Sequence, residues 1–131
     1  MVYRKTTFVF PALRLIVTSA FADPAAVAKQ TRAWRTSHEH EILTEFTDLL
    51  SIPNLASDAP NIQRNADAIR AMCEKRGLVA KLLTLKGAPP VVVADLTVPD
   101  AKRTIAFYAH YDGQPVDASQ WKSEPWKPVL R

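Results

Sequence analysis

The segment from Arg103 to Asp112 constrains the fold more than any other part of this 131-residue chain. Its apolar run, Ile105–Ala109, is short and continuous, which is typical of a strand buried in a sheet that is covered on both faces. The run leads directly into His110, and Asp112 follows two positions later. We therefore expect a strand over residues 104–109 whose carboxyl end presents a histidine and an aspartate, the place where α/β enzymes carry much of their chemistry.

His110 and Asp112 are the candidate site residues. Side chains two residues apart in an extended segment lie on one face, so Asp112 is placed to accept a hydrogen bond from the imidazole. A neutral histidine binds a divalent metal through one ring nitrogen and donates its other N–H to such a carboxylate. Taken alone, the H-x-D pattern also fits a partly buried histidine that only hydrogen-bonds its neighbour, so both interpretations stay open.

The wider segment favours the metal site. FYAHYDGQPVD, then Trp121 and EPWKPVLR, closely resemble the first metal-ligand segment of a zinc metallopeptidase family. That family includes carnosinases and other dipeptidases, aminoacylases, acetylornithine deacetylase, succinyl-diaminopimelate desuccinylase and glutamate carboxypeptidases. Its members typically carry a strand ending in G-H-x-D-x-x-P, then a tryptophan and a P-F-x-P segment. This chain has Ala109 where glycine is common and Trp126 where phenylalanine is usual.

The resemblance implies an α/β fold, namely the amino-terminal part of a layered, mixed-sheet zinc exopeptidase catalytic domain that is incomplete here. It implies a hydrolase of amide bonds in a small peptide or N-acyl amino acid, using two zinc ions, or cobalt or manganese instead. His110 would be a metal ligand and Asp112 the catalytic residue that orients it. The resemblance also allows a homodimer of the intact protein. The alternative is a non-catalytic binding domain, or the inactive product of a disrupted gene.

The family's further ligand motifs, such as a G-R-G-x-x-D-type segment and an adjacent glutamate pair, do not occur in these 131 residues. Catalytic and structural zinc sites use three or four protein ligands. His38 and His40 are expected to be solvated, because two residues apart on a helix they point in different directions. Cys73 has apolar neighbours at helical spacing and no evident histidine partner, so we expect a core residue rather than a nucleophile. The chain alone should be inactive.

Two helices followed by strands are expected before the candidate site. Thr36 and Glu39 predict a capping box that opens a helix ending before Pro53. A second helix should run from Asn61 to Arg76, with Gly77 as a left-handed C-cap. Short turns at residues 86–90 and 99–102 should join three strands, which are expected over residues 79–85, 91–96 and 104–109.

The amino terminus resembles a secretory signal. Basic residues at 4–5 precede an apolar stretch at 8–17, and small residues at 20 and 22 suit signal peptidase. We expect a signal peptide over residues 1–22 and export to the periplasm or the extracellular space. Because Arg14 interrupts the stretch, a cytoplasmic protein with a wrongly assigned start is the alternative. The stretch is too short and too charged for a stable membrane span.

After this leader we expect a lead-in segment over residues 23–35 and the partial catalytic domain over residues 36–131. The net charge of +4 comes mostly from the leader, because 14 basic residues face 13 acidic ones in the rest of the chain. No Lys/Arg run with interleaved aromatics remains, so nucleic acid is not an expected partner. The aromatic and proline residues after the site either wall a metal cleft or pin the loop to the surface; they are Trp121, Pro125, Trp126 and Pro128.

Overall fold

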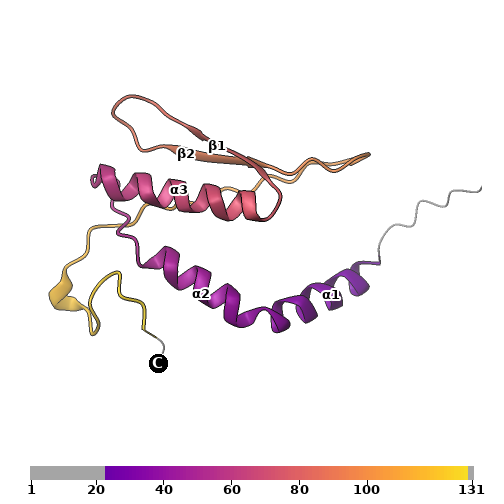
Figure 1. Cartoon of the computed structure of the whole chain (residues 1–131), viewed down its shortest axis with the longest axis horizontal. Helices are drawn as coiled ribbons and strands as arrows, with labels where there is room; N and C mark the ends of the chain where they lie inside the picture. The colour runs from indigo at the N-terminus through magenta and orange to yellow at the C-terminus, as the bar shows by residue number, and fades with distance from the viewer. Residues whose placement is uncertain (1–22, 130–131) are drawn as a thin grey trace, which may run out of the picture. The chain divides into compact units, whose positions relative to one another are not determined.

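A computed structural model describes residues 23–129 of the chain (Figure 1). The expected signal peptide, residues 1–22, lies outside the described residues. The chain divides into two units, residues 1–37 and 38–131, and helix α1 (Pro24–Ser37) belongs to the first. The second unit holds helices α2 (Glu39–Leu50) and α3 (Ala59–Lys75), strands β1 (Val79–Leu83) and β2 (Val91–Asp95), and a 3-10 turn, η1 (Ala118–Gln120). Helices and a small sheet together give the α/β class that the sequence predicts.

The capping box expected at Thr36 is wrong. Thr36 lies in the last turn of α1, which continues to Ser37, and α2 begins at Glu39. A residue with helical backbone cannot take the extended geometry that an N-cap needs. The Ser37 hydroxyl instead donates to the carbonyl of Trp34 at 2.9 Å. Glu39 does lie in the first turn of α2, where a negative charge suits the positive end of the helix dipole.

Both ends of α3 are capped by identifiable residues. The Asp58 carboxylate accepts from the backbone N–H of Asn61 at 3.3 Å, and from its side-chain amide at 2.7 Å. At the other end, Gly77 has a φ of 80°, which confirms the expected left-handed C-cap. Its N–H donates to the carbonyl of Glu74 at 2.9 Å, and the N–H of Leu78 reaches that of Cys73 at 3.1 Å. This pair of bonds is the Schellman motif, which satisfies carbonyls that the helix leaves open.

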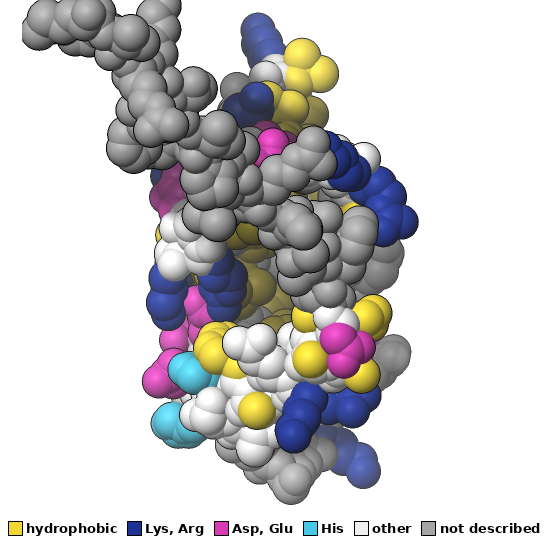
Figure 2. Space-filling view, turned by 90° about the vertical axis from the view of Figure 1, so that its right-hand side faces the viewer, with side chains coloured by type: hydrophobic (Ala, Val, Ile, Leu, Met, Phe, Trp, Pro, Cys, Tyr) yellow, Lys and Arg dark blue, Asp and Glu magenta, His cyan; other side chains and the backbone are white. Residues whose placement is uncertain are grey.

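Strands β1 and β2 form an antiparallel hairpin that lies against α3 (Figure 1). Val79 pairs with Asp95 and Leu83 with Val91, so the expected short turn between the two strands is confirmed. The fully buried core is small among the described residues. Ile62 and Ala66, on the face of α3, are 2% and 0% exposed. Figure 2 shows hydrophobic side chains at the surface between charged ones.

The third strand, expected over residues 104–109, does not form. Those residues are outside any helix or strand, and all their side chains are exposed. Ile105, Phe107 and Tyr108 are 77%, 93% and 87% exposed. A strand exists only through ladder hydrogen bonds to a neighbour, and no partner strand reaches this segment within residues 23–129. The sheet described here is therefore two-stranded and antiparallel, not mixed.

Candidate functional site

Tyr108, His110 and Asp112 form a hydrogen-bonded row on the exposed segment that follows β2. His110 Nδ1 lies 3.0 Å from Asp112 Oδ1, and His110 Nε2 lies 3.1 Å from the Tyr108 hydroxyl. The tyrosine and histidine rings meet edge to face, with centroids 5.4 Å apart. In the tautomer with its proton on Nδ1, the imidazole donates to Asp112 and accepts from Tyr108. The spacing of two thus brings Asp112 to His110 as expected, and it brings Tyr108 as well.

Asn54, in the loop after α2, fixes the chain that follows this row. The Gly113 N–H donates to the Asn54 carbonyl at 2.8 Å, next to a parallel bridge between Leu55 and Gly113. The Asn54 amide donates to the Tyr111 carbonyl at 3.2 Å, and its Oδ1 accepts from the Trp126 indole at 3.4 Å. A β-carbon at position 113 would lie 2.5 Å from Asn54 Oδ1. Only glycine permits so close an approach. We call the contacts of Asn54 with Tyr111, Gly113 and Trp126 the Asn54 latch.

Tyr111 anchors the same segment to the hairpin. Its hydroxyl donates to the carbonyl of Pro90, a buried residue directly before β2. Burial, and to a lesser extent the charge of Asp112, raises the pKa of the Tyr111 phenol above its ordinary value. Within residues 110–112, alternate side chains therefore have different surroundings. Tyr111 holds the segment to the scaffold, while His110 and Asp112 face solvent.

A large open pocket lies beside the row, with a volume of about 1480 Å³. Its walls come from α2, α3 and the chain after residue 109, represented by Phe46, Leu49, Met72, Cys73, His110 and Trp126. Such a volume exceeds the roughly 300–1,000 Å³ of a typical small-molecule site. The residues expected to wall a cleft, Trp121, Pro125, Trp126 and Pro128, all line it. Trp126 also binds Asn54, so it both walls the pocket and pins the loop.

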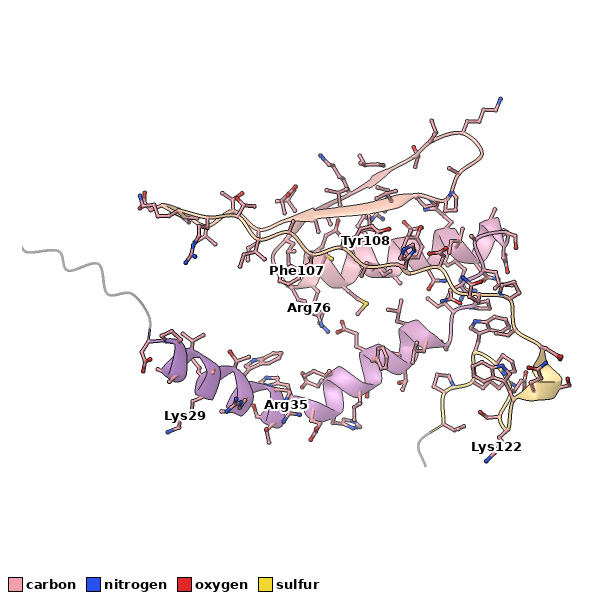
Figure 3. The ribbon with its side chains drawn as sticks, turned by 180° about the vertical axis from the view of Figure 1, so that it is seen from behind. Lys29, Arg35, Arg76, Phe107, Tyr108 and Lys122 are labelled. Atoms are coloured by element: carbon pink, nitrogen blue, oxygen red, sulfur yellow. The ribbon has the colours of Figure 1, made fainter. Side chains whose placement is uncertain are left out.

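An ion pair between the two helices borders the pocket. Arg76, near the end of α3, points towards α2 and binds the Glu45 carboxylate, with Nη1 at 3.3 Å from Oε1 (Figure 3). Lys75 Nζ lies 3.5 Å from the same oxygen. The hydrogen bond from Arg76 is the main reason that the pKa of Glu45 lies below its ordinary value. These ion pairs join α2 to α3, so we assign Glu45, Lys75 and Arg76 a structural role.

The described residues do not complete a metal site. Within residues 23–129 no three His, Cys, Asp or Glu side chains lie close enough to share an ion. His110 and Asp112 supply an imidazole and a carboxylate, which fits one corner of a site that normally has three or four protein ligands. The Tyr108 hydroxyl would also have to leave Nε2 before an ion bound there.

The other candidate residues stay apart from this row. His38 and His40 flank the start of α2, at the opposite end of the second unit's sequence. Cys73 is a free, half-buried thiol in the pocket wall, so it is less enclosed than the expected core residue. The sequence reasoning missed Tyr108 and Asn54. The same-face argument that selected Asp112 would have selected Tyr108, whereas nothing in the local sequence marks Asn54.

No family model, curated protein or solved structure matches the chain. The resemblance to the zinc metallopeptidases therefore rests on the residues of the 103–131 segment, and the assignment stays a prediction. Across residues 23–129, no helix combines the length and the apolar character needed to cross a bilayer.

Proposed function

We propose that this chain is part of a metal-dependent hydrolase of amide bonds in small peptides or N-acyl amino acids. The observation that carries the proposal is the 3.0 Å contact between His110 Nδ1 and Asp112 Oδ1, at the end of an apolar extended segment and beside the pocket. A carboxylate on one ring nitrogen fixes the tautomer and raises the basicity of the other, which is how proteins prepare a histidine for a metal.

The surroundings of His110 support this role. Its side chain is 71% exposed, so an ion can reach it. The Tyr108 hydroxyl beside Nε2 belongs to a side chain that is itself exposed, and a rotation about its χ angles frees the nitrogen. His110 then contributes one ligand, and Asp112 holds the ring in place. Zinc is the proposed metal, with cobalt or manganese as substitutes.

The remaining ligands and the proton-transfer groups are proposed to come from residues other than 23–129. We also propose that the protein is exported, with cleavage after Ala22. Amino-terminal sequencing of the mature protein checks this point, because export predicts Asp23 as the first residue. A mature protein that keeps residues 1–22 would contradict it.

The test uses the intact protein that contains this chain. His110→Ala should remove the metal ligand and reduce hydrolysis of dipeptides and N-acyl amino acids by several orders of magnitude. Asp112→Ala should weaken metal affinity or activity by roughly 10- to 100-fold, the usual scale for a residue that orients a ligand. His40→Ala is the matched control and should change neither the metal content nor the rate.

Metal content is measured alongside turnover, so that a folding defect is separated from loss of a ligand. If His110→Ala kept its full metal complement and near-normal turnover, the site assignment would be wrong. If Asp112→Ala lost metal as completely as His110→Ala, Asp112 would be a direct ligand instead.

The lack of a three-residue ligand group within residues 23–129 favours a second candidate, a non-catalytic binding domain that uses the pocket. The two candidates differ in one measurement. An intact protein that folds, binds peptides and never hydrolyses them in the presence of zinc, cobalt or manganese would support the binding domain.

A further inference from the structure

Residues 102–112 form an exposed segment that pairs with no strand within residues 23–129. Within residues 23–129, no backbone hydrogen bond joins residues 102–110 to another backbone group. Figure 3 draws this segment as plain coil, with Phe107 and Tyr108 labelled on it. An exposed extended segment with open N–H and C=O groups and β-branched or aromatic side chains is a template for strand pairing.

We propose that this segment becomes a strand by pairing antiparallel with the same segment of a second copy, centred on Phe107. In an antiparallel pair, directly opposite side chains lie on the same face of the sheet. A two-fold axis perpendicular to the pair relates each face of the two-stranded sheet to itself. Directly opposite residues must therefore both have odd numbers or both have even numbers. One residue therefore has to pair with itself at the axis, and Ala106, Phe107 and Tyr108 are the central choices.

Charge selects Phe107 among these three. Lys102 and Asp112 each lie five residues from Phe107, so this register places Lys102 opposite Asp112 of the partner subunit, twice over. The apolar pairs fall between these charges, with Ile105 opposite Ala109 of the partner subunit. Asp112 already has Oδ1 on His110, which leaves Oδ2 for the incoming lysine.

The other two registers are worse. Centring on Ala106 sets Lys102 opposite His110 of the partner subunit and leaves Asp112 without a facing residue in the segment, so no ion pair with a carboxylate forms. Centring on Tyr108 sets Lys102 opposite Gln114 of the partner subunit, which forms no ion pair. The Phe107 register is thus the one that satisfies symmetry, charge and apolar contact together.

Disulfide cross-linking of the full chain tests the register. Each variant carries Cys73→Ala, because Cys73 is a free thiol. Phe107→Cys should cross-link two copies rapidly under mild oxidation, since facing residues have Cα atoms roughly 4.5–5.5 Å apart. Ile105→Cys is the matched control. Its two copies would lie four residues out of step, roughly 14 Å apart, which is beyond disulfide reach.

Sedimentation of the chain with native thiols tests the pairing itself. A dimer is expected, and Phe107→Glu, which sets two carboxylates at the axis, should give a monomer. Leu85→Glu, at an exposed apolar position in the turn after β1, should leave the dimer intact.

Lys102→Glu should weaken the dimer roughly tenfold, and adding Asp112→Lys should restore it, because the pairs are then re-formed with reversed charge. Failure of Phe107→Cys to cross-link, equal cross-linking at positions 105 and 107, or a monomeric native chain would each overturn the proposal. Large assemblies without a preferred register would overturn it too.

Discussion

Gly113 passes so near Asn54 that its lack of a side chain is a structural requirement. The added β-carbon of Gly113→Ala would meet Oδ1 at 2.5 Å, and either the amide or the backbone would have to move. Three hydrogen bonds depend on that position, from the Gly113 N–H, to the Tyr111 carbonyl and from the Trp126 indole. The candidate site therefore depends on Gly113, a residue that has no side chain with which to bind or react.

Gly113→Ala should lower the free energy of unfolding by about 1–3 kcal/mol, the usual cost of overpacking. Urea unfolding measures it. Adding Asn54→Ala removes the clashing amide, so the double variant should lose less stability than the sum of the two single losses. Strictly additive losses would show that the two residues are not in contact.

Tyr111 predicts a loss of stability at alkaline pH. Its folded pKa lies above the ordinary value of 10.0, so the neutral phenol stabilises the protein fully below about pH 10. That contribution is lost as the pH rises through the folded pKa. Tyr111→Phe should lower the free energy of unfolding by about 1 kcal/mol at neutral pH, because the bond to the Pro90 carbonyl is lost. Above pH 10, the stability of this variant should fall less than that of the native chain.

Urea unfolding on both sides of pH 10 measures this difference, with Tyr108→Phe as the control because Tyr108 is exposed. An alkaline decline of equal size in the native chain and in Tyr111→Phe would contradict the role given to the phenol.

At the same scale, local spacing predicted part of the candidate site. The distance of two residues predicted the contact between His110 and Asp112, and the same rule covers Tyr108. Asn54 was beyond reach, because it meets Tyr111 across 57 residues and no periodicity links them. Residue patterns predict contacts between neighbours along the chain. The contacts that fix the candidate site join residues that are far apart in the sequence.

Among the elements, α3 is the one whose sequence and structure agree best. Apolar residues at helical spacing, the glycine after its end and the turn before it all predict a helix, and Gly77 forms the expected cap. The hairpin was also predictable from local sequence, because its two strands are neighbours along the chain. Residues 104–109 have strand-like composition, but strand formation needs a partner that composition cannot supply.

Asp58 should contribute to α3 through its capping bonds to Asn61. Asp58→Ala should lower the free energy of unfolding by about 1 kcal/mol, the typical loss for an N-cap. Thermal or urea unfolding checks it, with Ser57→Ala, an exposed neighbour in the same loop, as the control. A loss no greater than that of Ser57→Ala would mean that the cap is not stabilising.

At the scale of the whole molecule, two properties of residues 23–129 lead to a prediction. Their fully buried core is small, and they hold no group of three side chains that could share a metal ion. Residues 23–131 alone should show no stoichiometric zinc after dialysis and no peptide hydrolysis, because an imidazole and one carboxylate do not hold zinc tightly. They should also associate, since apolar side chains and an open strand are exposed. Metal analysis, a hydrolysis assay and light scattering measure these properties. Metal-dependent turnover by a monodisperse preparation would overturn the view that these residues are one part of a larger catalytic unit.

The Asn54 latch has a consequence for the order in which the second unit folds. It joins residue 54 to residues 111 and 113, so closing it encloses α3 and the hairpin in one long loop. Local contacts form before such closures, because the entropy of the open loop must first be overcome. Helix α3 and the hairpin should therefore acquire protection from hydrogen exchange early, and the amide of Gly113 late. His110 and Asp112 would then reach their final surroundings only after everything that supports them is in place.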